Sequence, residues 1–386
     1  MISTENNTIK NILASNGLDG DIGLWQRRLD QITKADVKRA LDSVPGTYNI
    51  NKLLALISPA AESYLEQMAQ MSQSLTIQRF GRTMKLYAPL YLSSYCSNSC
   101  LYCGFNTQNK TERKRLTISQ AIEEAKLLAE YGFSDVLLVS SEDKNFITVD
   151  YLTELAKKLK PMFSSISVEI YQMTEDEYKK LFCAGIEGVT LYQETYNRDA
   201  YRLYHRSGSK ADFDNRLQSP DNFAAAGMRE IGIGVLLGLA DWRLETLALA
   251  RHGHYLMKKY WKSRISFSFP RLRPASQVES SNFEHLIDTK SLTQMIIALR
   301  LCFADASLVL STREPADIRN NLIKLGITKI SAGSKTNPGG YADDKISIKQ
   351  FQVNDNRSPA QIAQMIRTKG MEPVFKDWDK AFTKTD

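Results

Sequence analysis

Eight short apolar or β-branched runs follow one another from residue 85 onward, and segments with helical periodicity separate them. Alternation of this kind is typical of a parallel sheet in which a helix follows each strand. Eight such units over about 250 residues match the size of a TIM barrel. A partial barrel of six units, with the last two runs outside it, is the alternative. We therefore predict an α/β protein built on a (β/α)8 barrel, with strands at residues 86–92, 135–140, 165–171, 188–193, 231–237, 264–269, 307–311 and 329–332.

The same pattern divides the chain into three parts. Residues 1–80 carry helical patterns, including a capped segment that begins at Thr33, but no motif with recognisable chemistry. The barrel is expected over residues 81–336. Residues 337–386 leave it through a Pro-Gly-Gly turn and contain a helix start at Ser358. We expect an N-terminal helical extension and a C-terminal extension that packs on the barrel.

Composition limits the classes of partner. The 50 Lys and Arg residues exceed the 43 Asp and Glu residues by a net charge of only +7, which suits small anionic molecules. No stretch interleaves basic and aromatic residues, so nucleic acid is not an expected partner. No run is apolar enough to span a membrane, and the first residues lack the pattern of a signal peptide. We expect a cytoplasmic protein.

Three of the five cysteines, Cys96, Cys100 and Cys103, lie within eight residues with the spacing C-x-x-x-C-x-x-C. Three thiolates on one loop leave one iron of a four-iron cluster without a protein ligand. A zinc site needs a fourth ligand, and the four histidines at 205, 252, 254 and 285 are all distant in sequence. A disulfide needs an oxidising compartment. We predict that these cysteines bind a 4Fe-4S cluster, and that Cys183 and Cys302 are core thiols.

Polar side chains recur where the predicted strands end. In a TIM barrel the carboxyl ends of the strands meet at one face, and that face carries the active site. The cysteine loop follows the first strand, and a single exposed charge elsewhere would need no explanation. The candidates at the other strand ends are Ser140, Ser141, Glu142, Glu169, Glu194, Arg271, Ser311 and Arg313.

The cysteine spacing resembles the signature of the radical S-adenosylmethionine (SAM) superfamily. That resemblance implies that SAM chelates the open iron and yields a 5′-deoxyadenosyl radical, so the cofactor supplies the difficult chemistry. Tyr102 stands where the superfamily commonly has an aromatic residue beside the cluster. Ser140, Ser141 and Glu142 replace its Gly-Gly-Glu, which meets the SAM amino group. The resemblance places further cofactor contacts at Glu169, Glu194, Lys210, Arg216 and Arg271.

Four further motifs resemble those of the radical SAM aromatic amino-acid lyases, and the resemblance extends from about residue 78 to residue 379. Among these lyases the chain looks most like the tyrosine lyases of bacterial thiazole biosynthesis. Arg313, beside Ser311, is then expected to bind the carboxylate of the amino-acid substrate, because a guanidinium matches a carboxylate with two hydrogen bonds. The motifs are Gln193-Glu194-Thr195-Tyr196, Pro270-Arg271-Leu272-Arg273-Pro274, Ser311-Thr312-Arg313-Glu314 and Pro338-Gly339-Gly340-Tyr341.

This resemblance implies a complete reaction. The radical removes a hydrogen atom from the amino group of L-tyrosine, and the Cα–Cβ bond breaks. The fragments become 2-iminoacetate (dehydroglycine) and p-cresol, while SAM becomes 5′-deoxyadenosine and methionine. The partners implied are a thiazole synthase that consumes the imine and an electron donor such as flavodoxin or ferredoxin.

Three alternatives remain open from the residues alone. The related tyrosine lyases of hydrogenase maturation carry extra C-terminal cysteines, and this chain has none after Cys302. Tryptophan lyases and other radical SAM reactions on amino acids share much of the pattern. A non-catalytic metal-binding scaffold is the alternative from a different class, and metal analysis separates it from the enzymes.

Overall fold

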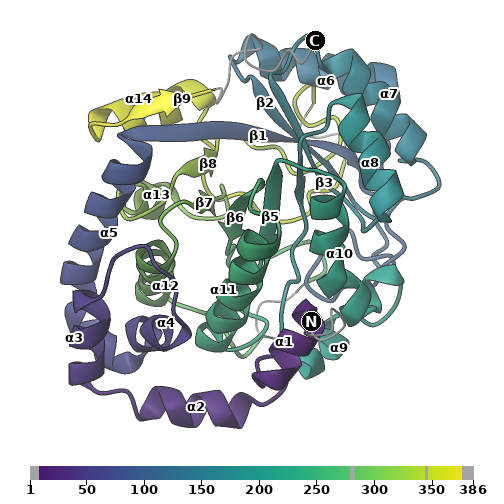
Figure 1. The fold of residues 1–386 in the computed structure, drawn as a ribbon. Coiled ribbons are helices and arrows are strands. Elements are labelled where there is room, and N and C mark those ends of the chain that lie inside the picture. Colours follow the sequence, from purple (N-terminus) through teal and green to yellow (C-terminus); the bar gives the residue numbers. More distant parts are fainter. Residues whose placement is uncertain (1–7, 279–282, 344–346, 376–386) are drawn as a thin grey trace.

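The chain was analysed as a computed structural model that describes residues 8–278, 283–343 and 347–375. The motif at residues 376–379 therefore lies outside the described residues. Eight parallel strands form a closed barrel in which each strand pairs with the next and β1 pairs with both β2 and β8 (Figure 1). The strands are β1 Thr83–Ser93, β2 Asp135–Ser140, β3 Ser165–Glu169, β4 Gly188–Thr190, β5 Glu230–Gly234, β6 Arg264–Ser268, β7 Ser307–Leu310 and β8 Lys329–Ser331. All eight predicted strands are present, and the six-unit barrel is excluded.

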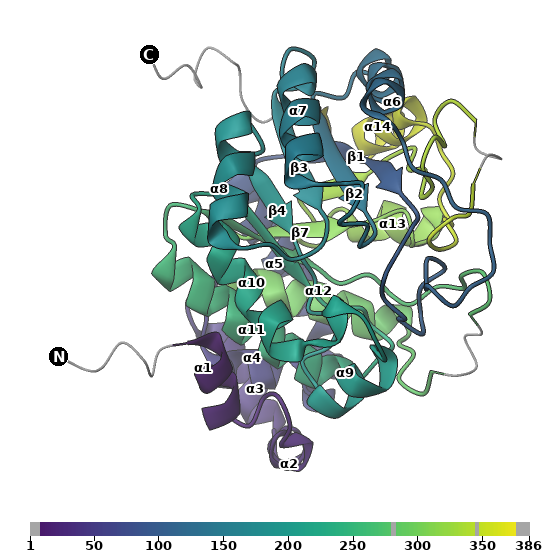
Figure 2. The same cartoon turned by 90° about the vertical axis from the view of Figure 1, so that its right-hand side faces the viewer.

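Helices follow the strands and cover the outside of the barrel (Figures 1 and 2). Three of them begin with the capping boxes expected from sequence, in which Thr117, Thr174 and Ser358 bond to the third helical residue. Cys183 is exposed on α8, so its prediction as a core thiol is wrong: Leu181 and Ala184 face the barrel instead. The helices are α6 Ile118–Glu130, α7 Val149–Leu159, α8 Glu175–Ala184, α9 Arg198–Tyr204, α10 Phe213–Ala225, α11 Trp242–Lys259, α12 Thr289–Cys302, α13 Ala316–Leu322 and α14 Pro359–Thr368.

The N-terminal helices pack on one side of the barrel, against α10, α11 and α12. The contact is fixed by buried groups: the Gln294 side-chain amide on α12 donates to the carbonyls of Leu56 and Ser58 at 3.0 and 2.9 Å. Figure 1 shows these helices in purple and blue below and beside the barrel. They are α1 Ile9–Ser15, α2 Ile22–Asp30, α3 Lys34–Asp42, α4 Ile50–Ile57 and α5 Leu65–Phe80, with a 3-10 turn at Pro59–Tyr64.

The segment after β8 returns across the carboxyl ends of the strands. The backbone N–H of Gln352 donates to Pro274 and that of Asn354 donates to Thr312, so the segment is tied to the loops after β6 and β7. The chain then forms α14 and a short strand, β9 Glu372–Val374, which pairs in parallel with the first residues of β1. The sequence analysis did not predict β9. Among the described residues, no helix has the length and apolar character that crossing a membrane would need.

Candidate active site at the carboxyl ends of the strands

The cysteine loop follows β1 and is held by hydrogen bonds at several points. The Arg113 guanidinium donates to the carbonyls of Ser94, Phe105 and Asn106, which joins the start of the loop to its far side. The backbone N–H of Leu101 donates to Tyr204 at 3.0 Å, so the loop also pairs with the end of α9. A segment without regular structure is therefore fixed in one conformation beside the barrel mouth.

The three cysteines fit a multi-iron cluster better than a single metal ion. All three line one cavity, yet in the part of the chain that the structure describes no three Cys, His, Asp or Glu side chains form a group that could hold a metal ion. A cube binds each thiolate to a different iron, so its ligands need not converge. Burial raises the pKa of Cys100 to about 12 and that of Cys103 to about 11, so the thiolates need the positive charge of a metal.

Tyr102 lines the cavity beside the cysteines, and His205 fixes its side chain. The Tyr102 hydroxyl lies 2.8 Å from His205 Nε2, while His205 Nδ1 lies 2.9 Å from the carbonyl oxygen of Tyr201. A carbonyl only accepts, so Nδ1 carries the proton and Nε2 accepts from Tyr102. Burial lowers the pKa of His205 to about 3, which keeps the imidazole neutral.

The residues that end β2 also line this cavity. Glu142 accepts hydrogen bonds from the side chains of Asn98, at 2.6 Å, and Ser209, and it lies 3.1 Å from the Lys144 ammonium. Its carboxylate thereby joins the cysteine loop to the segment before α10. Ser140 and Ser141 occupy the strand edge, and the Ser141 N–H donates to the Ser93 carbonyl of β1.

Glu194 and Lys210 form an ion pair inside the same cavity, with 2.6 Å between Nζ and Oε1. Glu194 has a φ of 72°, which is uncommon for a residue with a side chain and marks a constrained turn. Burial alone would raise the pKa of Glu194, but Lys210 and Arg216 hold it below its usual value. Arg216 itself donates to the Tyr192 carbonyl and to Gln172.

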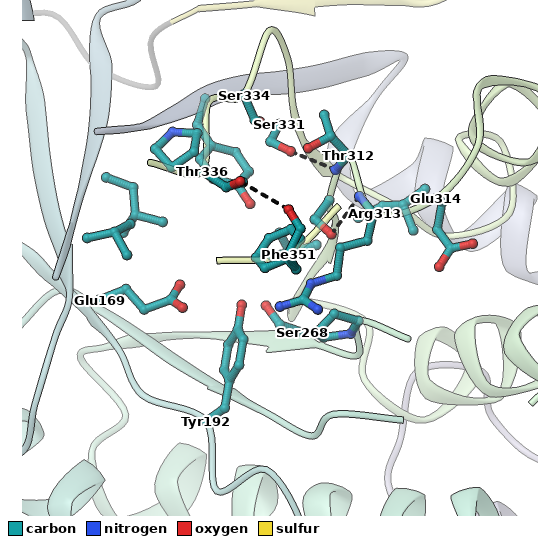
Figure 3. A pocket seen from close by; sticks show the side chains of 18 of the residues that line it. Glu169, Tyr192, Ser268, Thr312, Arg313, Glu314, Ser331, Ser334, Thr336 and Phe351 are labelled. Carbon is teal, nitrogen blue, oxygen red and sulfur yellow. Dashed lines mark hydrogen bonds between the residues drawn. The ribbon is translucent and has the colours of Figure 1, made fainter. Parts of the chain in front are cut away.

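A second cavity continues from the first into the barrel. Figure 3 shows Glu169, Tyr192 and Arg313 pointing into it from different strands. Both cavities are lined by Glu169, Tyr192, Arg313 and Phe351, so these residues mark the junction of the two. Ser311 lines the inner cavity, and its hydroxyl accepts from the backbone N–H of Arg313 at 3.4 Å. Apolar and aromatic side chains form much of the inner wall, including Tyr87, Tyr91, Leu137, Val139, Val309 and Leu310.

The Arg313 guanidinium lies over the Phe351 ring, 3.4 Å from its centre, and within the described residues no carboxylate pairs with it. Glu314, the neighbour of Arg313, pairs instead with Arg271 and Arg273. Arg271 is buried by that pairing and also donates to the carbonyl of Ile287, and it lines neither cavity. The structure thus brings together every predicted site residue except Arg271.

Four residues of the site were not identified from the sequence. Asn98 and His205 organise the cysteine loop, and Tyr192 and Phe351 stand at the junction of the cavities. Tyr192 lies two residues before Glu194, at the end of a predicted strand, so its position was a usable signal. Phe351 lies in a segment without secondary structure, and only the three-dimensional fold brings it to the barrel.

Comparison with known proteins agrees with this geometry. Residues 90–250 match the radical SAM superfamily, and residues 268–372 match the Biotin and Thiamin Synthesis associated domain. The chain is 43% identical over 354 residues to 2-iminoacetate synthase of Escherichia coli K12, covering 91% of this chain and 93% of that protein.

Two solved structures extend the comparison. HydG, a maturase of the FeFe-hydrogenase, superposes with a TM-score of 0.88 at 30% identity, covering 93% of this chain and 81% of that one. Methylornithine synthase PylB shares the fold, with a TM-score of 0.71 at 21% identity over 88% of this chain and 97% of that one. The chain belongs to the 2-iminoacetate synthase family of radical SAM enzymes.

Proposed function

We propose that this protein is a radical SAM lyase that cleaves the Cα–Cβ bond of L-tyrosine to give 2-iminoacetate and p-cresol, for the thiazole moiety of thiamine. The observation that carries this proposal is the juxtaposition of a three-cysteine cavity and an inner cavity that share Arg313. High identity over most of the chain to a protein of that activity supports it. The inner wall, with its aromatic and aliphatic side chains, suits the ring of an aromatic amino acid.

Cys96, Cys100 and Cys103 would hold a 4Fe-4S cluster, and the surrounding residues would hold SAM. The strand edge at Ser140 and Ser141 offers backbone groups, and Glu142, Glu194 and Lys210 offer charges of both signs, as a zwitterionic methionine moiety needs. Tyr102 and Arg216 complete the wall, the first beside the cysteines and the second beside Glu194. When bound, these cofactors supply a 5′-deoxyadenosyl radical that abstracts hydrogen.

The protein's own contribution is placement and protection. Arg313 would bind the tyrosine carboxylate at the junction of the cavities, with the Ser311 loop holding it there, so that the amino group faces the SAM side. A hydrogen atom leaves the amine, the Cα–Cβ bond breaks, and an electron and a proton convert the 4-hydroxybenzyl fragment to p-cresol. The segment carrying Phe351 lines both cavities and so helps to separate the reacting atoms from bulk water.

Two partners belong to this proposal. Water hydrolyses an imine, so 2-iminoacetate needs a nearby consumer, and a thiazole synthase fits that need. Reductive cleavage of SAM needs a low-potential donor such as flavodoxin or ferredoxin. Arg271, paired with Glu314 outside the cavities, is best assigned to shaping the loop after β6 rather than to the cofactor.

The test is anaerobic turnover of the reconstituted protein in D2O with SAM, a reductant and unlabelled tyrosine. An amine N–H exchanges with solvent and a C–H does not, so abstraction from the amine places one deuterium in 5′-deoxyadenosine. We expect labelled deoxyadenosine together with p-cresol. Unlabelled deoxyadenosine would point to abstraction from carbon and contradict the proposal. Replacing tyrosine with tryptophan distinguishes the tryptophan-lyase alternative.

A further inference from the structure

Two opposite charges at the junction of the cavities lack partners. In the described part of the chain, the Glu169 carboxylate makes no hydrogen bond or ion pair, and the Arg313 guanidinium contacts only the Phe351 ring. The neighbouring carboxylates differ, because Glu194 pairs with Lys210 and Glu142 accepts three polar contacts. A half-buried charge without a partner is unfavourable unless a ligand supplies one.

The two unpartnered charges match a free amino acid. Figure 3 shows the Glu169 carboxylate and the Arg313 guanidinium entering the cavity from opposite sides, with the Tyr192 hydroxyl between them. A carboxylate held by Arg313 would leave the α-amino group on the Glu169 side. Both residues border the SAM cavity, so that amino group would also face the place where the hydrogen atom is removed.

The chemistry of the step makes this position important. At neutral pH an amino acid carries an ammonium group, whereas an aminyl radical forms from the neutral amine. The ammonium proton must therefore leave before the hydrogen atom does. We propose that Glu169 receives the α-ammonium group of the substrate and takes one proton from it, so that the amine presented to the SAM cavity is neutral. The step converts an ammonium and a carboxylate to an amine and a carboxylic acid, with no other reactant. This inference rests on the function proposed above.

The surroundings of Glu169 suit a group that takes up and releases a proton near neutral pH. Burial, and secondly the charge of Glu194, raise the pKa of Glu169 to about 7, while Arg313, Lys210 and Arg216 oppose that rise. The hydroxyls of Tyr87, Tyr91 and Tyr192 face it from β1 and from the chain after β4. Burial raises the pKa of Tyr91 and Tyr192 well above their usual value, so neither hydroxyl competes for the role of base.

The test is the variant Glu169→Gln, assayed for p-cresol between neutral and alkaline pH at saturating SAM. Gln keeps the size of the side chain but accepts no proton, so p-cresol formation should fall by about 10² or more at neutral pH. The rate should then recover as the pH rises, because tyrosine loses its ammonium proton in solution. The KM for SAM should stay within about threefold of the wild type, since the loss lies in proton transfer and not in cofactor binding.

Glu187→Gln is the matched control. Glu187 is also half-buried with a raised pKa, but it precedes β4 at the opposite end of the barrel and pairs with Arg229. This control should retain normal turnover. Wild-type rates in Glu169→Gln at neutral pH, or a loss that persists at alkaline pH with a raised KM for SAM, would overturn the inference. If the wild type itself forms no p-cresol, the proposed function fails instead, so the two failures are distinct.

Discussion

The guanidinium of Arg313 stacks on the ring of Phe351, 3.4 Å from the ring centre, although the two residues come from different parts of the chain. Arg313 follows β7, and Phe351 lies in the segment that crosses the barrel mouth after β8. Stacking uses the flat face of the guanidinium and leaves the N–H groups at its edge free to donate. The C-terminal extension thus helps to orient the arginine assigned to substrate binding.

Replacing Phe351 with Leu should therefore weaken tyrosine binding. The loss of the cation–π contact should raise the KM for tyrosine by about 3- to 30-fold, with a smaller effect on kcat. Cleavage of SAM without tyrosine should be unchanged. Phe163→Leu, at the opposite end of the barrel, is the control for lost aromatic packing. An unchanged KM in Phe351→Leu would show that the stacking does not orient Arg313.

Arg313→Ala should nearly abolish tyrosine turnover while the absorption spectrum of the cluster stays intact. Arg313→Lys should restore little activity, because an ammonium group neither binds a carboxylate through two parallel hydrogen bonds nor stacks flat on a ring. Steady-state assays for p-cresol, paired with iron analysis of each variant, measure both effects. Normal turnover in Arg313→Ala would remove this residue from the substrate site.

Cys100→Ser should prevent cluster assembly. Anaerobic reconstitution followed by iron and sulfide analysis should give near-complete loss of both, together with loss of SAM cleavage. Cys302→Ser is the matched control, because Cys302 is equally buried but lies in α12 away from the cavity. A cluster that assembles in Cys100→Ser with the iron content of the control would contradict the assignment.

Asp355 and Arg319 form a fully buried ion pair that joins the C-terminal segment to α13. Burial would raise the pKa of Asp355, but Arg357 and Arg319 hold it below its usual 3.8. A depressed carboxyl pKa stabilises the fold above the unfolded-state pKa, and this stability is lost as the pH falls through the folded-state value. Asp355→Asn should lower the free energy of unfolding by about 3–5 kcal/mol.

Urea denaturation of the wild type and Asp355→Asn at several pH values measures this effect. The difference in stability should shrink below about pH 4, where the wild-type carboxylate becomes protonated. The double variant Arg319→Met with Asp355→Leu should lose less stability than Asp355→Asn, because it leaves no buried charge without a partner. A difference that is constant with pH would argue against an ionised Asp355.

The sequence was sufficient for the barrel because its strands are signalled locally. Continuous apolar runs, capping residues such as Thr117 and Thr174, and a regular spacing all agree with one fold. The short strand β9 escaped prediction because the three residues Glu372–Val374 carry no periodic signal and become a strand only beside β1. Cys183 was misassigned because helical periodicity identifies an apolar face less precisely than packing does.

The site was predictable where a motif or a strand end marked it. The cysteines, Glu142, Glu169, Glu194 and Arg313 were expected at one face, and the structure places them around two joined cavities. Partners were not predictable, because pairing depends on distances that the order of residues does not give. Arg271 and Arg313 both follow strands and look alike in sequence, yet only Arg271 is paired with Glu314. Phe351, in an irregular segment, carried no signal at all.

The most direct test of the central claim is anaerobic turnover of the reconstituted protein with SAM, a reductant and L-tyrosine, scored for p-cresol and 5′-deoxyadenosine together. We predict that both products form in step and that 2-iminoacetate, or the glyoxylate produced by its hydrolysis, accompanies them. Deoxyadenosine without p-cresol, from a protein with an intact cluster and a supply of electrons, would contradict cleavage of tyrosine at the Cα–Cβ bond.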